Sequence, residues 1–122
     1  MSRELRDDER ALLDRLTEGD DDIAVALRDQ ITAARHSRNW SESDQSFDIE
    51  IDGAVPVPLA DGIYPPSDLP FTLSSGEQGG LMLWIKSGLI DGLEVYWFDE
   101  EIPRLPSPDE LTPWEGVYRE RD

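Results

Sequence analysis

The chain of 122 residues contains no cysteine. Disulfides, thiolate metal sites and cysteine nucleophiles are therefore excluded, and the fold must depend on packing alone. Histidine occurs once, at His36, which also excludes a zinc site with two histidines. No apolar run approaches the length of a transmembrane helix, and the charged start, residues 1–10, lacks the apolar core of a signal peptide. We therefore expect a cytoplasmic protein that neither spans nor binds a membrane.

Basic side chains are scarce and unevenly distributed. The chain has 11 of them against 28 acidic ones, a formal net charge of -17. Between Asn39 and Pro103, thirteen carboxylates accompany a single basic residue, Lys86. Such acidity argues against direct binding of nucleic acid, because phosphates would be repelled, and it favours a cationic protein partner. General acidification, through genome composition or a salty cytoplasm, is the alternative that involves no partner.

Apolar residues at helical spacing predict that the first part of the chain, residues 1–38, is helical. Ser2 is expected to cap a helix that runs to Glu18, and Gly19 to end it. A second helix is expected to start at residues 20–22, three aspartates that act as caps, and to continue to Arg38 with its apolar residues three or four apart. At this length we expect one domain, residues 1–122.

From Ser46 the period changes to two, which predicts an antiparallel sheet over residues 46–98. Phe47, Ile49 and Ile51 alternate with acidic residues, as in a strand with one dry and one wet face. The proline-rich stretch 54–70 permits at most a short edge strand. Further strands are expected at 71–74, 81–86 and 93–98. The last two are expected to be joined through residues 87–92, where Gly88 and the pair Asp91 and Gly92 supply the turn chemistry.

The two strands of this hairpin are apolar on both faces. One set is expected in the core beneath the helices: Leu81, Leu83, Ile85, Leu93, Val95 and Trp97. The opposite set is Met82, Trp84, Lys86, Glu94, Tyr96 and Phe98. We expect the proline-rich tail, residues 99–122, to cover this second set with its apolar anchors Ile102, Leu105, Leu111, Trp114, Val117 and Tyr118.

The tail is expected to contain one short helical turn, where Ser107 to Glu110 form a capping box and Pro113 ends it. The predicted fold class is therefore α+β, with two N-terminal helices packed on a four- to five-stranded antiparallel sheet whose central hairpin is formed by the last two strands.

Motifs for catalysis or metal binding are incomplete. The string DIEIDG, residues 48–53, imitates a calcium loop but has Leu59 where the final glutamate is required. The glycine-rich stretch 74–80 lacks the lysine of a phosphate loop. His36 could act as the base of a catalytic triad, but the sequence contains no nucleophile elbow. The acidic cluster Asp99, Glu100 and Glu101 would be the first place to seek acid–base chemistry. We expect no enzyme, no catalytic residue, no metal and no cofactor.

Three strings carry a resemblance to known proteins: ERALLDRL (residues 9–16), SFDIEIDG (residues 46–53) and GGLMLWIKSGLIDGLEVYWFDEE (residues 79–101). They resemble a loose group of small acidic uncharacterised bacterial proteins, in which the final hairpin commonly ends in a strand of the type of Leu93, Glu94 and Trp97 and an acidic, proline-rich exit. Some members are similar to the immunity proteins of polymorphic toxin systems. The resemblance implies a binding protein and assigns no catalytic role.

The leading hypothesis is a non-catalytic protein of the immunity or inhibitor type, which captures a basic toxin or nuclease through an acidic sheet face with an aromatic centre. The expected partner-binding residues are Asp48, Glu50, Asp52, Trp84, Glu94, Tyr96, Phe98, Asp99, Glu100 and Glu101. Two alternatives remain open: a homo-oligomeric structural subunit, with a homodimer as its simplest form and acidity serving solubility, and an inhibitor that mimics DNA.

Overall fold

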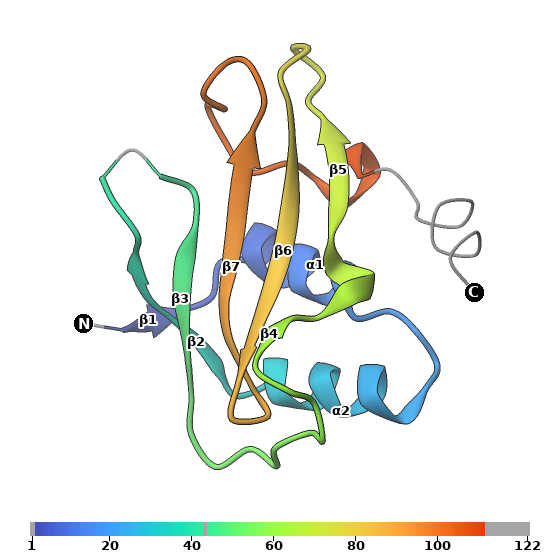
Figure 1. The fold of residues 1–122 in the computed structure, drawn as a ribbon. Helices are drawn as coiled ribbons and strands as arrows, with labels where there is room; N and C mark the ends of the chain where they lie inside the picture. Colours follow the sequence, from blue (N-terminus) through green and yellow to red (C-terminus); the bar gives the residue numbers. More distant parts are fainter. Residues whose placement is uncertain (1, 43, 112–122) are drawn as a thin grey trace.

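The computed structural model describes residues 2–42 and 44–111, and it confirms the α+β class (Figure 1). Within these residues the elements, in chain order, are β1 (Arg3–Glu4), α1 (Asp7–Leu16), α2 (Asp22–Ile31), β2 (Ala34–Asn39), β3 (Phe47–Ile51), β4 (Gly62–Ile63), the 3-10 turn η1 (Pro65–Ser67), β5 (Leu69–Thr72), β6 (Gln78–Lys86), β7 (Leu89–Trp97) and the 3-10 turn η2 (Pro108–Glu110).

The strands of the described residues form one antiparallel sheet in the order β1-β2-β3-β7-β6-β4, and β5 also pairs with β6. The β6–β7 hairpin lies at its centre, as predicted. One edge of β6 carries two short strands, β4 opposite Trp84 and Ile85 and β5 opposite residues 78–81. The sheet exceeds the expected four to five strands because β1 and β2 lie in the segment that was predicted to be helical.

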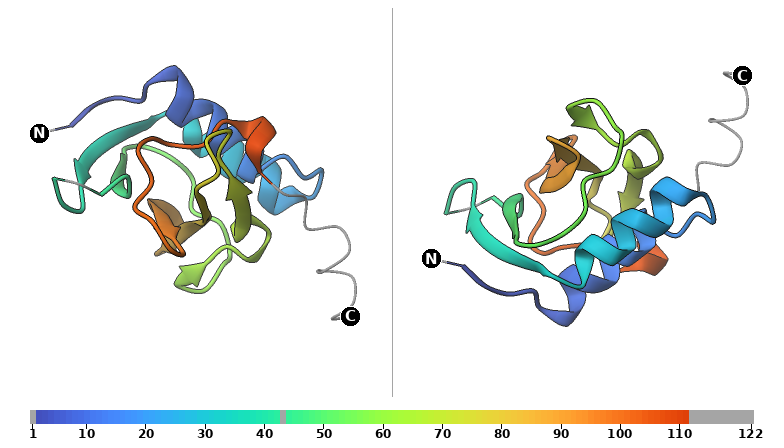
Figure 2. Two further views of the ribbon diagram at one scale, coloured as in Figure 1. Left: turned by 90° about the horizontal axis from the view of Figure 1, so that it is seen from above. Right: turned by 90° about the horizontal axis from the view of Figure 1, so that it is seen from below.

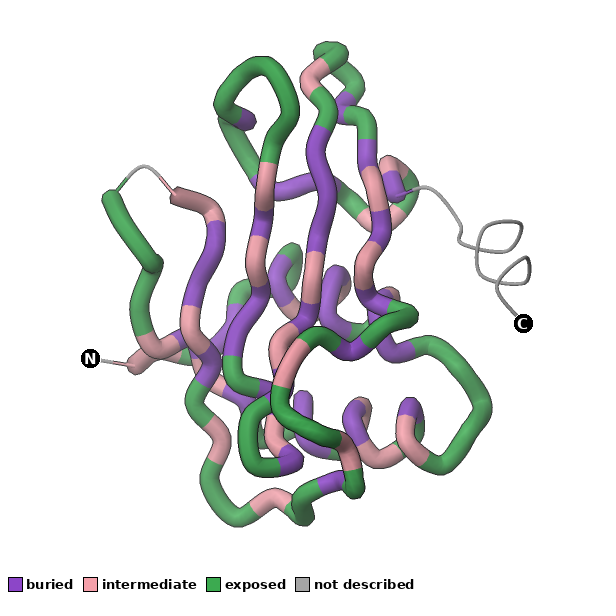
Figure 3. The backbone as a smooth tube through the Cα atoms, in the orientation of Figure 1, coloured by how far each residue is buried: buried purple, intermediate pink, exposed green. Residues whose placement is uncertain are grey.

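Both helices lie on one side of the curved sheet and enclose the core with it (Figure 2). Buried and partly buried residues alternate along much of β6 and β7 (Figure 3), and the buried apolar ones belong to one core cluster with residues of α1 and α2. The core set predicted from the hairpin is confirmed except for Trp97, which is 40% exposed. No helix of the described residues is long and apolar enough to cross a membrane.

The prediction that the second helix continues to Arg38 is wrong. The helix ends at Ile31, and Ala34–Asn39 form β2, which pairs with both β1 and β3. His36 is consequently a buried strand residue whose ring stacks on Phe47 at a centroid distance of 4.7 Å. The alanines at 33 and 34 favour a helix locally, but pairing with β3 outweighs that preference.

Carboxylates fix the starts of both helices. Asp21 accepts a hydrogen bond from the Ala24 backbone N–H at 3.2 Å, which confirms the prediction of an aspartate cap. The prediction of a cap at Ser2 is wrong, because the first helix begins at Asp7, where Glu9 accepts from the Arg6 backbone N–H at 2.8 Å. Burial opposes ionisation of Glu9, but its bonds with Arg3 and Arg6 outweigh burial and lower its pKa.

The hairpin turn is shorter than the predicted connection, residues 87–92, and lies at its start. Ser87 and Gly88 adopt φ angles of 54° and 76°, as in a two-residue type I′ turn. The predicted turn residue Gly88 is confirmed, but the prediction is wrong for Asp91 and Gly92, because both belong to β7. Gly92 serves the sheet in another way: a Cβ there would lie 3.0 Å from the Phe47 carbonyl oxygen, so glycine lets β3 approach closely.

The described part of the tail closes the core and leaves the aromatic set of the hairpin uncovered, so that expectation is wrong for these residues. Ile102, Leu105 and Leu111 join the main core, and Leu111 bridges to Phe71 of β5. The predicted capping box at Ser107 to Glu110 is confirmed in η2. The other expected features, Pro113, Trp114, Val117 and Tyr118, lie outside the described residues.

Candidate functional site

The face of the sheet that points away from the helices combines aromatic and acidic side chains. Register places Met82 beside Glu94 and Gly80 beside Tyr96 on this face. Asp48 of β3 pairs with Gly92, which in turn pairs with Trp84. Because side chains of adjacent strands that are in register share a face, the acidic side of β3 adjoins the aromatic side of the hairpin.

Each of three aromatic side chains on this face donates a hydrogen bond to a carboxylate. Trp40 Nε1 donates to Asp48 Oδ1 at 3.0 Å, and Trp84 Nε1 donates to Glu94 Oε1 at 2.9 Å. The Tyr96 hydroxyl donates to Asp68 Oδ1 at 3.3 Å. We call this set the aromatic–carboxylate face: Trp40, Asp48, Asp68, Trp84, Glu94 and Tyr96.

Gly80 makes room for the tyrosine of this face. A Cβ at Gly80 would lie 2.1 Å from the Tyr96 hydroxyl oxygen, so only glycine allows the ring to cross β6 towards Asp68. Burial and the neighbouring Asp68 carboxylate raise the pKa of Tyr96. The phenol therefore stays protonated at neutral pH and remains a hydrogen-bond donor.

Two hollows adjoin Trp40, whose side chain is 45% exposed. The larger, which we call the Trp84 hollow, has a volume of about 430 Å³ and is lined by Trp40, Asp48, Asp61, Gly62, Trp84, Ile85, Lys86, Asp91 and Gly92. The smaller, which we call the Trp97 hollow, has a volume of about 260 Å³ and is lined by Trp40, Asp44, Ser46, Glu94, Val95, Tyr96 and Trp97. Among these described residues five carboxylates accompany one cation, Lys86.

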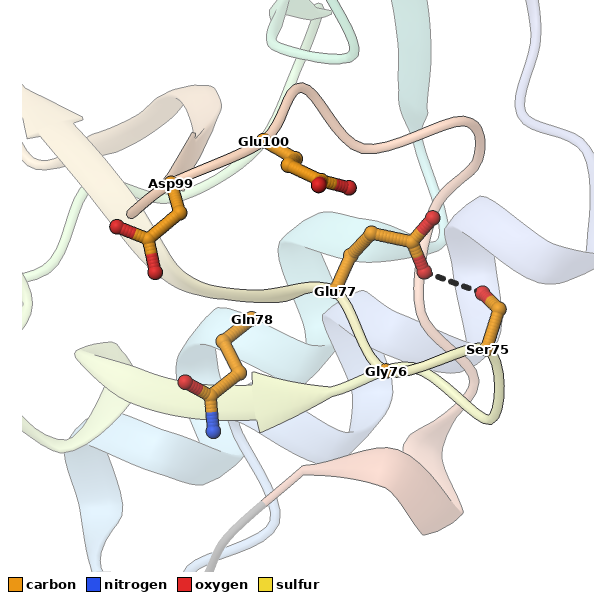
Figure 4. Close-up of a pocket in the computed structure, with 6 residues that line it drawn as sticks. All are labelled: Ser75, Gly76, Glu77, Gln78, Asp99 and Glu100. Atoms are coloured by element: carbon orange, nitrogen blue, oxygen red, sulfur yellow. Dashed lines mark hydrogen bonds between the residues drawn. The ribbon is translucent and has the colours of Figure 1, made fainter.

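A third hollow, of about 340 Å³, lies between the turn before β6 and the loop after β7 (Figure 4). Asp99 and Glu100 come from the loop, and Glu77 comes from the turn, where Ser75 donates a hydrogen bond to its carboxylate and thereby lowers its pKa. The described residues contain no group of three or more His, Asp or Glu side chains that could hold a metal ion. These acids therefore form a charged rim.

The structure brings together only some of the predicted site residues. Asp48, Trp84, Glu94 and Tyr96 belong to the aromatic–carboxylate face, and Asp99 and Glu100 line the third hollow. Phe98 is 59% exposed and its ring lies 5.8 Å from that of Tyr96. Like Phe98, three further predicted residues line none of the three hollows: Glu50, Asp52 and Glu101.

Arginines of β2 reduce the charge along β3. Arg38 forms an ion pair with Asp48 at 3.1 Å, and Arg35 lies opposite Glu50 in the register of the two strands. The negative potential on β3 is therefore weaker than its sequence suggests. Four carboxylates that line the two hollows beside Trp40 have no ion pair within the described residues: Asp44, Asp61, Asp91 and Glu94.

Sequence analysis missed several residues of the site: Trp40, Asp44, Asp61, Asp68, Asp91 and, as an exposed residue, Trp97. Trp40 was missed because the segment before it, up to Arg38, was predicted to be a helix. A strand at 34–39 would have indicated a hairpin with Trp40 near its tip. Trp97 leaves the core because β3 starts at Phe47, opposite Leu93, so no described strand flanks the end of β7 on that side.

Comparison of the chain with protein-family models, with curated proteins and with solved structures gave no match. The functional argument therefore rests on the geometry and charge of the site.

Proposed function

We propose that this chain is a non-catalytic binding protein of the immunity or inhibitor type, which captures a basic protein such as a toxin or nuclease in the cytoplasm. One observation carries the proposal: Trp40, Trp84 and Tyr96 each donate a hydrogen bond to a carboxylate on the sheet face that points away from the helices. The aromatic–carboxylate face would be the centre of the interface, and the acidic rim formed by Glu77, Asp99 and Glu100 would lie at its margin.

The three hydrogen bonds suit recognition of a guanidinium or ammonium group. Each bond holds a carboxylate in one orientation. Asp48 is already paired with Arg38, but Asp68 and Glu94 have no ion pair within the described residues and retain lone pairs for a second donor. The indole and phenol faces beside them attract cations through their π electrons. Tryptophan and tyrosine also dominate the binding energy of many protein interfaces, since they bury a large area with few rotatable bonds.

The charge distribution favours fast capture. With five carboxylates and one lysine lining the hollows beside Trp40, a cationic surface is attracted before contact is made. Such steering raises the association rate at low ionic strength and is screened by salt.

The homo-oligomeric alternative is favoured by a different observation, the exposure of the large apolar side chains Trp40, Trp97 and Phe98. If two copies met through this face, however, their carboxylates would repel each other. Sedimentation distinguishes the two functions: a tight dimer that is insensitive to salt supports the structural subunit, and a monomer with a salt-sensitive partner supports the binding protein. An inhibitor that mimics DNA would in addition compete with DNA for its partner.

Capture from a lysate of the source cells at low salt, followed by a salt ramp, tests the proposal with two matched variants. The face variant, Asp48→Asn with Glu94→Gln, loses two charges but keeps oxygen acceptors for Trp40 and Trp84. The control variant, Asp14→Asn with Asp29→Asn, loses the same charge from exposed helix positions. We expect a basic protein to elute at lower salt from the face variant only. Equal elution from both variants would contradict the proposal.

Charge reversal at Glu50 and Asp52 tests whether the interface extends along β3. If it does, association slows and its salt dependence becomes flatter. Unchanged association would restrict the interface to the hollows beside Trp40.

A further inference from the structure

β3 pairs with only part of the edge of β7 that faces it, and the C-terminal part of that edge has no neighbouring strand among the described residues. Leu93 pairs with Phe47, the first residue of β3. At Val95 a side chain takes the place of a strand: Ser46 Oγ accepts from the Val95 N–H at 2.7 Å and donates to the Val95 carbonyl oxygen at 3.2 Å. Trp97 is the next residue whose backbone faces this edge.

The direction of the Trp97 backbone follows from its neighbours. The Phe98 N–H donates to the Gln78 carbonyl oxygen at 3.1 Å, so Phe98 is bonded towards β6. Because hydrogen-bonding directions alternate along an antiparallel strand, the N–H and C=O of Trp97 point to the opposite edge. No described strand pairs with Trp97 on that edge. Figure 1 shows the β2–β3 hairpin diverging from the upper end of β7 there.

The Trp97 hollow lies against this open edge. Its lining residues include two carboxylates, Asp44 and Glu94, and three aromatic rings, those of Trp40, Tyr96 and Trp97. None of the described residues that line it is basic. With a volume of about 260 Å³ the hollow can hold one long side chain next to a strand added at the edge.

We propose that an extended segment of the cationic partner adds to the sheet at Trp97 and inserts an arginine or lysine side chain into the Trp97 hollow. This inference rests on the proposed function and adds the docking mode. Backbone hydrogen bonds with Trp97 supply the affinity of strand addition, and the hollow supplies the side-chain preference. The segment residue opposite Trp97 shares the face of Trp97, so the residues on either side of it lie opposite Tyr96 and Phe98, on the face that also carries Glu94. The partner motif is a basic residue, any residue, and a second basic residue.

A blocked pentapeptide, acetyl-Thr-Arg-Val-Arg-Thr-amide, tests this docking mode against the full chain labelled with ¹⁵N. Two-dimensional NMR follows the Trp97 backbone amide and the indole N–H of Trp40 and Trp84 during titration. We expect the Trp97 amide to shift and its hydrogen exchange to slow. The matched control peptide carries an N-methyl group on its central valine, which keeps every charge but removes the N–H that pairs with Trp97. We expect it to bind about fivefold more weakly, the effect of one lost hydrogen bond.

The outcomes separate this inference from the proposed function. Binding that is weakened by N-methylation and by Glu94→Gln supports strand addition. Binding that depends on Glu94 but is equal for both peptides overturns strand addition, while the proposed function stands. No shift of the Trp97 amide at millimolar peptide also overturns the inference, and the lysate experiment with the Asp48 and Glu94 variants then decides the proposed function by itself.

Discussion

Polar side chains complete the sheet at the places where its strands stop short. Ser46 bonds to Val95 on one edge of the central hairpin, and the Ser67 hydroxyl accepts from the Leu83 N–H at 2.8 Å on the other. At the hairpin turn, Gln30 of α2 donates to the Gly88 carbonyl oxygen and accepts from the Ile90 N–H, both at 2.9 Å. These three residues are buried, and each accepts a hydrogen bond from a backbone N–H that would otherwise lack a partner.

Replacement of Gln30 should therefore lower the free energy of unfolding by more than the loss of its apolar contacts alone would. In Gln30→Ala, the Ile90 N–H would remain buried without a partner, while the Gly88 carbonyl oxygen would keep its bond from the Val57 N–H. We expect the free energy of unfolding to fall by about 1–3 kcal/mol. Urea denaturation measures the change. The control is Val25→Ala, an exposed position on the same helix, which should change stability by about 0.5 kcal/mol or less. A loss below 1 kcal/mol in Gln30→Ala would show that water replaces the amide.

A second residue-scale prediction concerns acid stability at the tail. Glu110 accepts hydrogen bonds from Arg104, from the Ser107 N–H and from the Ser74 N–H, which together lower its pKa from 4.5 to about 2. The stabilisation is present above pH 4.5 and is lost as the pH falls towards 2. We expect wild type to exceed Glu110→Gln in unfolding free energy by about 1 kcal/mol at pH 6 and by almost nothing at pH 2.

Urea denaturation at a series of pH values tests this difference, with Asp109→Asn as the control because its carboxylate is exposed next to Glu110. A gap between wild type and Glu110→Gln that does not change with pH would contradict the assignment.

At the scale of elements, periodicity predicted the strands of the sheet centre and missed its margin. Phe47–Ile51 and the two strands of the hairpin alternate clearly enough to be found from sequence. β2 could not be found in this way, since residues 33–36 continue the helical spacing and their pairing partners in β3 lie eight or more residues away from β2. Short strands such as β1 and β4 have no periodicity to detect, because each has two residues and depends on a neighbouring strand.

The hairpin turn yields a prediction with a matched glycine. Gly88 and Gly53 both have a φ of 76°, but a Cβ at Gly88 would lie 2.6 Å from the Val57 carbonyl oxygen, and one at Gly53 would meet nothing within 4 Å. Both alanine variants should lose about 1 kcal/mol for the left-handed backbone. Gly88→Ala should lose about 2 kcal/mol more, since the clash involves backbone. Equal losses in denaturation experiments would mean that the 53–61 segment moves aside freely.

At the scale of the whole molecule, composition predicted the excess of negative charge but could not locate it. The charge of the middle segment was expected along β3, yet Arg38 pairs with Asp48 there, and Arg35 lies opposite Glu50. The candidate site was predicted where strand alternation determines it, at Trp84, Glu94 and Tyr96. It was missed where loops supply the residue, as at Trp40, Asp44 and Asp61, because loop positions depend on tertiary contacts that sequence periodicity does not encode.

The net charge of -17 predicts an unusual response to salt. Repulsion among the carboxylates opposes the compact state, and it is screened as ionic strength rises. We expect the free energy of unfolding to increase by about 1 kcal/mol between 10 and 200 mM NaCl, as measured by urea denaturation. The triple variant Asp99→Asn, Glu100→Gln and Glu101→Gln should show a smaller increase. A decrease with salt in the wild-type protein would mean that its ion pairs outweigh the repulsion.

The narrow junction between β3 and β7 has one more consequence. Two register pairs join strands β1, β2 and β3 to the central hairpin: Phe47 with Leu93, and Asp48 with Gly92. Because only these two register pairs hold the strands together, we expect partial unfolding of the protein to begin there. Native-state hydrogen exchange would detect it as a group of amides in β2 and β3 that exchange together. Trp40 would move with strands β1, β2 and β3, while Trp84 would keep its place in the hairpin. A ligand bound in either hollow beside Trp40 would then slow amide hydrogen exchange throughout β2 and β3, including at residues far from the ligand.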